Sequence, residues 1–335
     1  MKKVLIAVFA MAACCFAATP YTGLMTNLNI ATFGIEDYSK IYGNHDADLI
    51  KNIDFAKGFR NSLQNHVSKK YSGTTFNGSY SNTKSSDVTV SNFQKEIKKN
   101  HNIVMFSGNG ISIHNTDGSV RRHGEVMMYD KYLPVENMTF SEQTYFAFFY
   151  ASNFLSFYTD SKGRDVYGFY NKKVNGVVST VKTPVTNYSE GDDDGWEDSQ
   201  EAKPQNVDYS IFVNSFANGL HAMFGFSSLT YTMTKVQNGN TKADLALYET
   251  FAQKWVDDGL RIWQAYKYAV WKVLYKTYSR GAEPAVIFKS GTAIGNDGKS
   301  HSFKGYCEFY KSIYQYPMKK GSLGRKKAVY GYPKY

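Results

Sequence analysis

Two continuous apolar runs place the strongest limit on how this chain can fold. The segments 102–107 and 144–151 have apolar or aromatic side chains at successive positions, over 103–106 and 145–151, rather than at alternate ones. Such runs are typical of parallel strands covered on both faces, because both sets of side chains then face a core. Two further apolar segments, 219–226 and 285–288, have the same character. The sequence therefore predicts an α/β fold with a mostly parallel sheet flanked by helices.

Helical spacing of apolar residues predicts the elements that cover this sheet. We expect helices over residues 50–65, 88–99, 244–258 and 260–279, and a helix-like segment over 209–217. Gly259 separates the last two helices and is typical of a C-cap. The large apolar side chains that recur along this pair are interpreted as core packing: Trp255, Trp263, Tyr266, Val270 and Leu274.

Three polar segments are expected outside the regular elements. Residues 71–86 are rich in Ser, Thr, Asn and Gly and predict a long loop, and residues 112–136 predict a hairpin-like insertion. Residues 187–206 form a second insertion, with seven acidic residues between 190 and 201. Acidic oxygens at this density could bind Ca²⁺, but their order lacks the alternating ligands of a calcium loop. We interpret this segment as a solvated acidic loop.

Residues 1–17 have the three parts of a secretory signal peptide. A positive start precedes an apolar run over residues 4–16, and a small-residue cleavage site follows at Ala17. This run is shorter than the roughly 20 residues that span a bilayer, and no later stretch approaches that length. We therefore expect a secreted, periplasmic or cell-surface protein whose mature chain has no transmembrane segment. A second interpretation is a lipid anchor at Cys14, because the residues before it loosely resemble a bacterial lipobox.

The mature chain is basic and contains a single cysteine. Removal of the leader with its two lysines lowers the formal net charge from +10 to +8 and leaves Cys307, interpreted as a buried small hydrophobe. The tail over residues 319–335 has six basic residues, several tyrosines and no acids. Such a tail suits an anionic cell-envelope component, whereas secretion argues against nucleic acid as a partner. The sequence leaves the oligomeric state open.

Motifs for several common chemistries are missing from the sequence. The seven histidines have no pairing at helical ligand spacing, and there is no His-Glu-x-x-His. The Gly-Asn-Gly at 108–110 lacks the longer glycine pattern and the Lys-Ser/Thr of a phosphate loop. The Gly-x-Ser-x-Gly elbow of hydrolases does not occur either. We therefore expect no metal and no cofactor.

The turns that follow the two apolar runs carry a family resemblance. Phe-Ser-Gly-Asn-Gly at 106–110 resembles the strand-end Gly-His-Gly of caspase-like cysteine peptidases, the clan of gingipains, legumains and caspases. Ala-Ser-Asn-Phe-Leu at 151–155 resembles their second strand end, where the nucleophilic cysteine follows small residues. The order of elements over roughly residues 30–290 is similar to an uncharacterised bacterial secreted family with a gingipain-like core. The resemblance implies one caspase-like three-layer α/β domain over residues 18–318.

The two catalytic positions of that family differ in this sequence. The resemblance places Asn109 at the position of the general-base histidine and Asn153 at that of the cysteine. An amide side chain has no titratable proton near neutral pH and supplies no thiolate, so thiol-peptidase chemistry is lost. We therefore expect a binding protein whose pocket takes a peptide, a glycan or a cell-envelope component. Its expected lining is Gly108, Asn109, Gly110, Ser152 and Asn153.

Two other functions stay open at the level of sequence. The first is an active hydrolase with a rebuilt site, using Ser152 as the nucleophile and His114 as the base. The second is a structural surface or adhesion protein, which predicts no concave pocket near the two strand ends. His221 lies within an apolar segment, where a core histidine is the favoured interpretation.

Overall fold

The computed structural model describes most of the chain between residues 27 and 304. The described ranges are 27–45, 48–114, 120–152, 154–155, 169–174, 177–182, 212, 214–226, 241–277, 284–294 and 300–304. The predicted leader, the acidic segment 187–206 and the tail 319–335 lie outside these residues.

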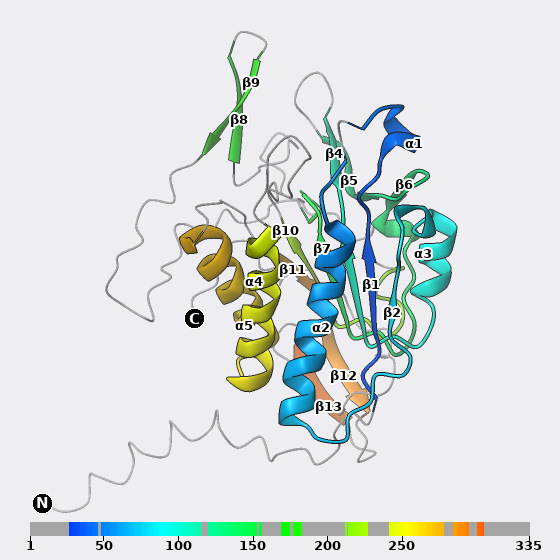
Figure 1. Cartoon of the computed structure of the whole chain (residues 1–335), viewed down its shortest axis with the longest axis vertical. Helices are drawn as coiled ribbons and strands as arrows, with labels where there is room; N and C mark the ends of the chain where they lie inside the picture. The colour runs from blue at the N-terminus through cyan, green and yellow to red at the C-terminus, as the bar shows by residue number, and fades with distance from the viewer. Residues whose placement is uncertain are drawn as a thin grey trace, which may run out of the picture.

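A six-stranded sheet forms the centre of the molecule (Figure 1). Its strands run in the order β2-β1-β3-β7-β10-β11, and every neighbouring pair is parallel except β10 and β11. The strands are β1 (Ile30–Gly34), β2 (Tyr80–Ser81), β3 (Ile103–Ser107), β7 (Phe146–Tyr150), β10 (Ala222–Phe226) and β11 (Pro284–Phe288). The prediction of a mostly parallel sheet flanked by helices is confirmed.

Successive side chains of these strands enter two separate cores, as expected for a sheet covered on both faces. Phe146, Phe148 and Tyr150 belong to one core, and Ala147 and Phe149 belong to the other. Both sets are buried, which explains why the strands read as continuous apolar runs in the sequence.

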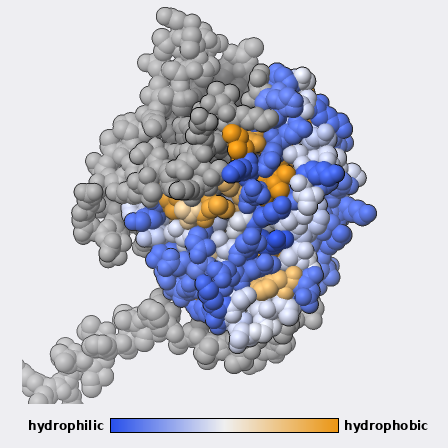
Figure 2. All heavy atoms as spheres, viewed as in Figure 1, coloured by the Kyte–Doolittle hydropathy of each residue, from blue (hydrophilic) through white to orange (hydrophobic). Residues whose placement is uncertain are grey.

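Three helices cover the first face of the sheet (Figure 1). They are α2 (Asn52–Lys70), α4 (Thr241–Ala252) and α5 (Ile262–Ala269), and the last two continue as π-helical segments over Gln253–Asp257 and Val270–Thr277. Gly259 has a φ of 76° between them, as predicted for a helix end. The recurring apolar side chains predicted along this helix pair, from Trp255 to Leu274, are buried in this core, and Trp263 is stacked on Phe224. The surface over α2 is mostly hydrophilic (Figure 2).

Helix α3 (Val90–Glu96) and a small antiparallel sheet cover the second face. That sheet contains β4 (Gly110–His114), β5 (Val120–Met127) and β6 (Tyr132–Pro134), and a 3₁₀ turn follows at Val135–Asn137. It occupies the predicted insertion 112–136, so the hairpin-like interpretation of that segment is confirmed. Helices, central sheet and this second layer together give the three predicted layers.

Several expectations are corrected by the structure. The expected loop 71–86 contains the edge strand β2 and the start of a 3₁₀ turn at Ser85–Asp87, because backbone pairing with β1 orders a polar segment. Within the expected helix-like segment 209–217, residues 214–216 form a turn instead. Strand β1 and the short helix α1 (Ser39–Tyr42) were not foreseen.

Two hairpins complete the described elements. They are β8 (Phe169–Val174) with β9 (Val177–Lys182), and β12 (Ser290–Ile294) with β13 (Ser300–Lys304). His221 is 1% exposed and lies against the ring of Tyr145, in agreement with a core role. Within the described part of the chain, no helix has both the length and the apolar character needed to cross a membrane.

Candidate functional site

The strand order creates a topological switch point between β1 and β3. The chain leaves β1 outward to the edge strand β2 and returns to β3, after which successive strands extend in the opposite direction. In open α/β sheets of this order, ligands bind in the crevice outside the carboxyl ends of the strands at such a point. The loop after β1 and the turn after β3 therefore lie where a ligand site is expected.

A buried asparagine holds these two strand ends and the start of α2 together. Asn52 is 0% exposed; its Nδ2 donates to the Ile35 carbonyl at 3.1 Å, and its Oδ1 accepts from Ser107 Oγ at 2.8 Å. The close approach of α2 to β1 also requires Gly34, because a Cβ there would strike the backbone of Ile53. These contacts fix the carboxyl ends of β1 and β3 relative to the start of α2.

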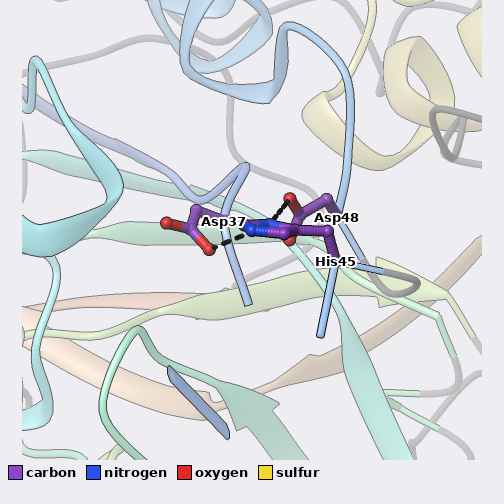
Figure 3. A group of neighbouring side chains, drawn as sticks. All are labelled: Asp37, His45 and Asp48. Carbon is purple, nitrogen blue, oxygen red and sulfur yellow. Dashed lines mark hydrogen bonds and ion pairs between the residues drawn. The ribbon is translucent and has the colours of Figure 1, made fainter. Parts of the chain in front are cut away.

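Three ionisable side chains converge in the loop that follows β1 (Figure 3). Nδ1 of His45 lies 2.7 Å from Oδ2 of Asp48 and 3.9 Å from Oδ1 of Asp37. The Asp48 side chain is 2% exposed, whereas those of Asp37 and His45 are 42% and 64% exposed. Because a carboxylate only accepts hydrogen bonds, the Asp48 contact assigns the proton to Nδ1. A buried acid thus orients an accessible imidazole.

Tyr38 links this loop to the turn after β3. Its backbone N–H donates to Oδ1 of Asp48 at 2.8 Å, and its hydroxyl oxygen accepts from the backbone N–H of Asn109 at 2.7 Å. Tyr38 is fully buried, and this burial raises the pKa of its hydroxyl far above the ordinary value, although the Asn109 hydrogen bond opposes the shift. The hydroxyl therefore stays neutral and joins the two sides of the switch point.

The predicted turn residues are held by their main chain. The Gly108 N–H donates to the Tyr150 carbonyl at 3.1 Å, and the Asn109 carbonyl accepts from the Met127 N–H at 2.9 Å. A Cβ on Gly110 would strike the Ser152 carbonyl, so only glycine allows this approach. The structure therefore brings the 108–110 turn and Ser152 together at adjacent strand ends.

Two other residues that the sequence predicts at the site are Asn153 and His114. Asn153 lies outside the described residues, so its position relative to Asn109 stays a prediction. His114 ends β4, and its backbone is described but its side chain is not.

Sequence reasoning missed the Asp37, His45 and Asp48 cluster. Metal ligands are recognised in a sequence by regular helical spacing, whereas these residues lie at irregular intervals after β1. A usable signal is present nonetheless: the acidic residues Glu36 and Asp37 follow soon after the end of the short, mostly apolar segment Ile30–Gly34. Recognising that segment as a strand would have placed them at a strand end.

Two hollows elsewhere in the described residues differ from this site. An apolar gap of about 10 Å³ between the sheet and the helices is lined by Phe59, Phe148, Tyr266 and their neighbours, and it is a packing void. An open polar groove of about 380 Å³ lies at the opposite, amino edge of the sheet, beside Asn100, Ser141 and Gln143. Neither hollow is lined by Asn52, by the 108–110 turn, by Ser152 or by the cluster of Asp37, His45 and Asp48.

Comparison with known proteins gives a distant structural likeness. The chain is similar to a crystal structure of the Arg-specific cysteine proteinase gingipain R, with 10% sequence identity and a TM-score of 0.36. The alignment covers 88% of this chain and 47% of that one, so the chain spans about half the length of the proteinase. No family model matches the sequence. No curated protein matches it either. The fold and the site therefore stand on strand order and contacts alone.

Proposed function

We propose that this protein is a secreted ligand-binding protein that binds a polar group of a peptide or glycan at the switch point, without cleaving it. The observation that carries the proposal is Asn109, an amide side chain on a fixed turn at the carboxyl end of β3. An amide offers both a donor and an acceptor, which suits recognition of another amide or of sugar hydroxyls. It offers no proton transfer near neutral pH.

The surroundings of Asn109 favour binding by a preformed site. Its N–H and its carbonyl are both engaged within the protein, so the turn has little freedom to lose when a ligand binds. Ser152, whose main-chain carbonyl lies close to Gly110, follows the next strand and brings a hydroxyl-bearing residue to the same edge of the sheet. The predicted replacement of both peptidase residues by Asn109 and Asn153 supports the same function.

The sequence supports the location of this function outside the cytoplasm. Cleavage after Ala17 would release a mature chain with a formal charge of +8 and the basic tail 319–335, suited to an anionic envelope. Mass spectrometry of the mature N-terminus tests this part: a chain beginning at Ala18 supports secretion. A chain that still begins at Met1 contradicts secretion. A chain that begins at a lipidated Cys14 shows that the protein is anchored to a membrane by a lipid and is not released.

A screen with matched variants tests the binding function. The purified chain is applied to a peptide library and a glycan array, and hits are measured by calorimetry with Asn109→Ala and with Asn61→Ala, an exposed asparagine on α2. We expect binding that is lost in Asn109→Ala and kept in Asn61→Ala, with no cleaved product. Equal binding by both variants would show that the ligand occupies another surface.

One observation favours a second function, hydrolysis at a rebuilt site. The Asp48–His45 pair has the acid–imidazole contact that orients the base of a catalytic triad, and it follows β1 at the same edge of the sheet as Ser152. This pair replaces His114 as the base in that hypothesis. Turnover of a peptide or ester that disappears in both Ser152→Ala and His45→Ala would establish hydrolysis. The absence of product across the library argues for binding alone.

A further inference from the structure

The loop after β1 gathers two carboxylates around one imidazole nitrogen. Asp37, His45 and Asp48 each offer a ligand atom, and these atoms lie within 4.8 Å of one another. Figure 3 shows the two aspartates approaching the His45 ring from either side. One oxygen is nearly buried while the imidazole is accessible, so an ion could enter from solvent and be held against the protein.

The two carboxylates are held in place by bonds to neighbouring groups. Oδ1 of Asp48 accepts from the Tyr38 N–H, which leaves Oδ2 to face His45. Oδ1 of Asp37, the oxygen nearer His45, accepts from the Ser39 N–H at 2.9 Å and from the Ser39 hydroxyl at 2.6 Å, so an ion bound there would replace the Ser39 hydroxyl. These contacts orient the acids in the way that outer partners orient the ligands of a metal. The position of the loop at the switch point is a separate indication of a ligand site.

The single Nδ1 proton of His45 can form a hydrogen bond with only one of the two carboxylates. Nδ1 has one hydrogen to donate, which Asp48 takes at 2.7 Å, while the Asp37 oxygen lies 3.9 Å from the same nitrogen. A divalent cation in place of that proton attracts both acids at once. In a tetrahedral site with bonds of about 2.0–2.2 Å, ligand atoms lie roughly 3.4 Å apart. The two distances from Nδ1 fall on either side of that value, and all three ligand atoms lie within 4.8 Å of one another, so modest shifts of the exposed His45 and Asp37 side chains would close the geometry.

We propose that Asp37, His45 and Asp48 bind a divalent transition metal of the Zn²⁺ class. The imidazole nitrogen favours Zn²⁺ over Ca²⁺ and Mg²⁺, which prefer all-oxygen ligands. Three protein ligands leave a fourth position for water or for a polar group of a bound ligand. This site differs from the sequence expectation of no metal, and it does not depend on the proposed function, because its ligands do not include Asn109 or Ser152.

Calorimetric titration of Zn²⁺ into the untagged, chelator-treated chain tests the proposal. We expect one Zn²⁺ per chain, with affinity lowered by about tenfold or more in Asp37→Asn and in His45→Ala. The matched control Asp54→Asn removes an exposed carboxylate from the first turn of α2, outside the cluster, and keeps the affinity.

Thermal unfolding with and without Zn²⁺ gives a second readout that does not depend on any ligand or activity. The metal should raise the melting temperature of the wild type and of Asp54→Asn but not of His45→Ala, a substitution at an exposed side chain that removes no core packing. Zn²⁺ binding that is unchanged in His45→Ala, or absent from the wild type, overturns the proposal. Tighter binding of Ca²⁺ than of Zn²⁺ overturns the metal class. The peptide and glycan screen is run with chelator present. A failure of the screen then counts against the proposed ligand binding alone, and a failure of the Zn²⁺ titration counts against the metal site alone.

Discussion

Replacement of Tyr38 by Phe should loosen the contact that joins the two sides of the switch point. Phe keeps the ring and its packing, so no cavity forms, and the change removes the hydroxyl alone. That oxygen is the acceptor of the Asn109 N–H at 2.7 Å, and the residue is fully buried. The substitution therefore leaves a backbone donor without its acceptor at the end of β3.

The magnitude follows from the cost of an unsatisfied donor. A buried polar group that loses its hydrogen bond costs about 1–3 kcal/mol, whereas the net value of an ordinary bond is nearer 1 kcal/mol. Asn109 is partly exposed, so water can reach it in part, and we expect a loss of about 1–2 kcal/mol in the free energy of unfolding. The Asp48 contact of the Tyr38 N–H is unaffected, because it comes from the main chain.

Urea unfolding of the wild type, Tyr38→Phe and Tyr129→Phe measures this loss. Tyr129 is partly exposed, with its ring near Lys40, and its hydroxyl should matter by less than about 0.5 kcal/mol. We also expect weaker ligand binding by Tyr38→Phe, because the Asn109 turn is no longer fixed. If Tyr38→Phe is as stable as Tyr129→Phe and binds equally well, the link through Tyr38 is not what holds the site.

Three further substitutions test other contacts. Gly110→Ala should lower the free energy of unfolding by about 1–3 kcal/mol and weaken ligand binding, because its Cβ would strike the Ser152 carbonyl. Urea unfolding measures the first effect and calorimetry the second. A variant as stable as the wild type would contradict the close contact between Gly110 and Ser152. Asn52→Ala should cost at least about 2 kcal/mol in urea unfolding, because two buried partners lose their bonds; a loss below about 0.5 kcal/mol contradicts its bridging role. Burial alone would raise the pKa of Glu249, but its hydrogen bonds, that from His66 foremost, lower it below the ordinary 4.5. A carboxyl group with a lowered pKa contributes stability that is present above about pH 4.5 and is lost as the pH falls further. The free energy of unfolding of Glu249→Gln should therefore fall less steeply below about pH 4.5 than that of the wild type. An unchanged dependence on pH would refute this contribution of Glu249.

The sequence predicts the central strands well because their signal is local. Strands β3 and β7 are buried on both faces, so all their side chains except Ser107 at the end of β3 are apolar or aromatic, and the pattern is visible in the sequence alone. The helix end at Gly259 is equally local, because a positive φ favours glycine. The hairpin insertion is visible as a polar, glycine-containing segment between two apolar strands.

Features that depend on long-range contacts were not predictable in this way. Strand β1 is five residues long in a polar region, and its partner β2 is a two-residue edge strand, so pairing rather than periodicity defines both. The Asp37, His45 and Asp48 cluster depends on how one loop folds back on itself through the Tyr38 N–H. Sequence spacing contains no record of that geometry.

Amide hydrogen exchange on the chain saturated with the tightest hit from the screen locates the binding surface most directly. We predict slower exchange on binding in residues 35–45 and 107–110, and no change at the amino-edge groove over 139–143. Protection confined to that groove, with the strand-end segments unchanged, would contradict a binding site at the junction of β1 and β3.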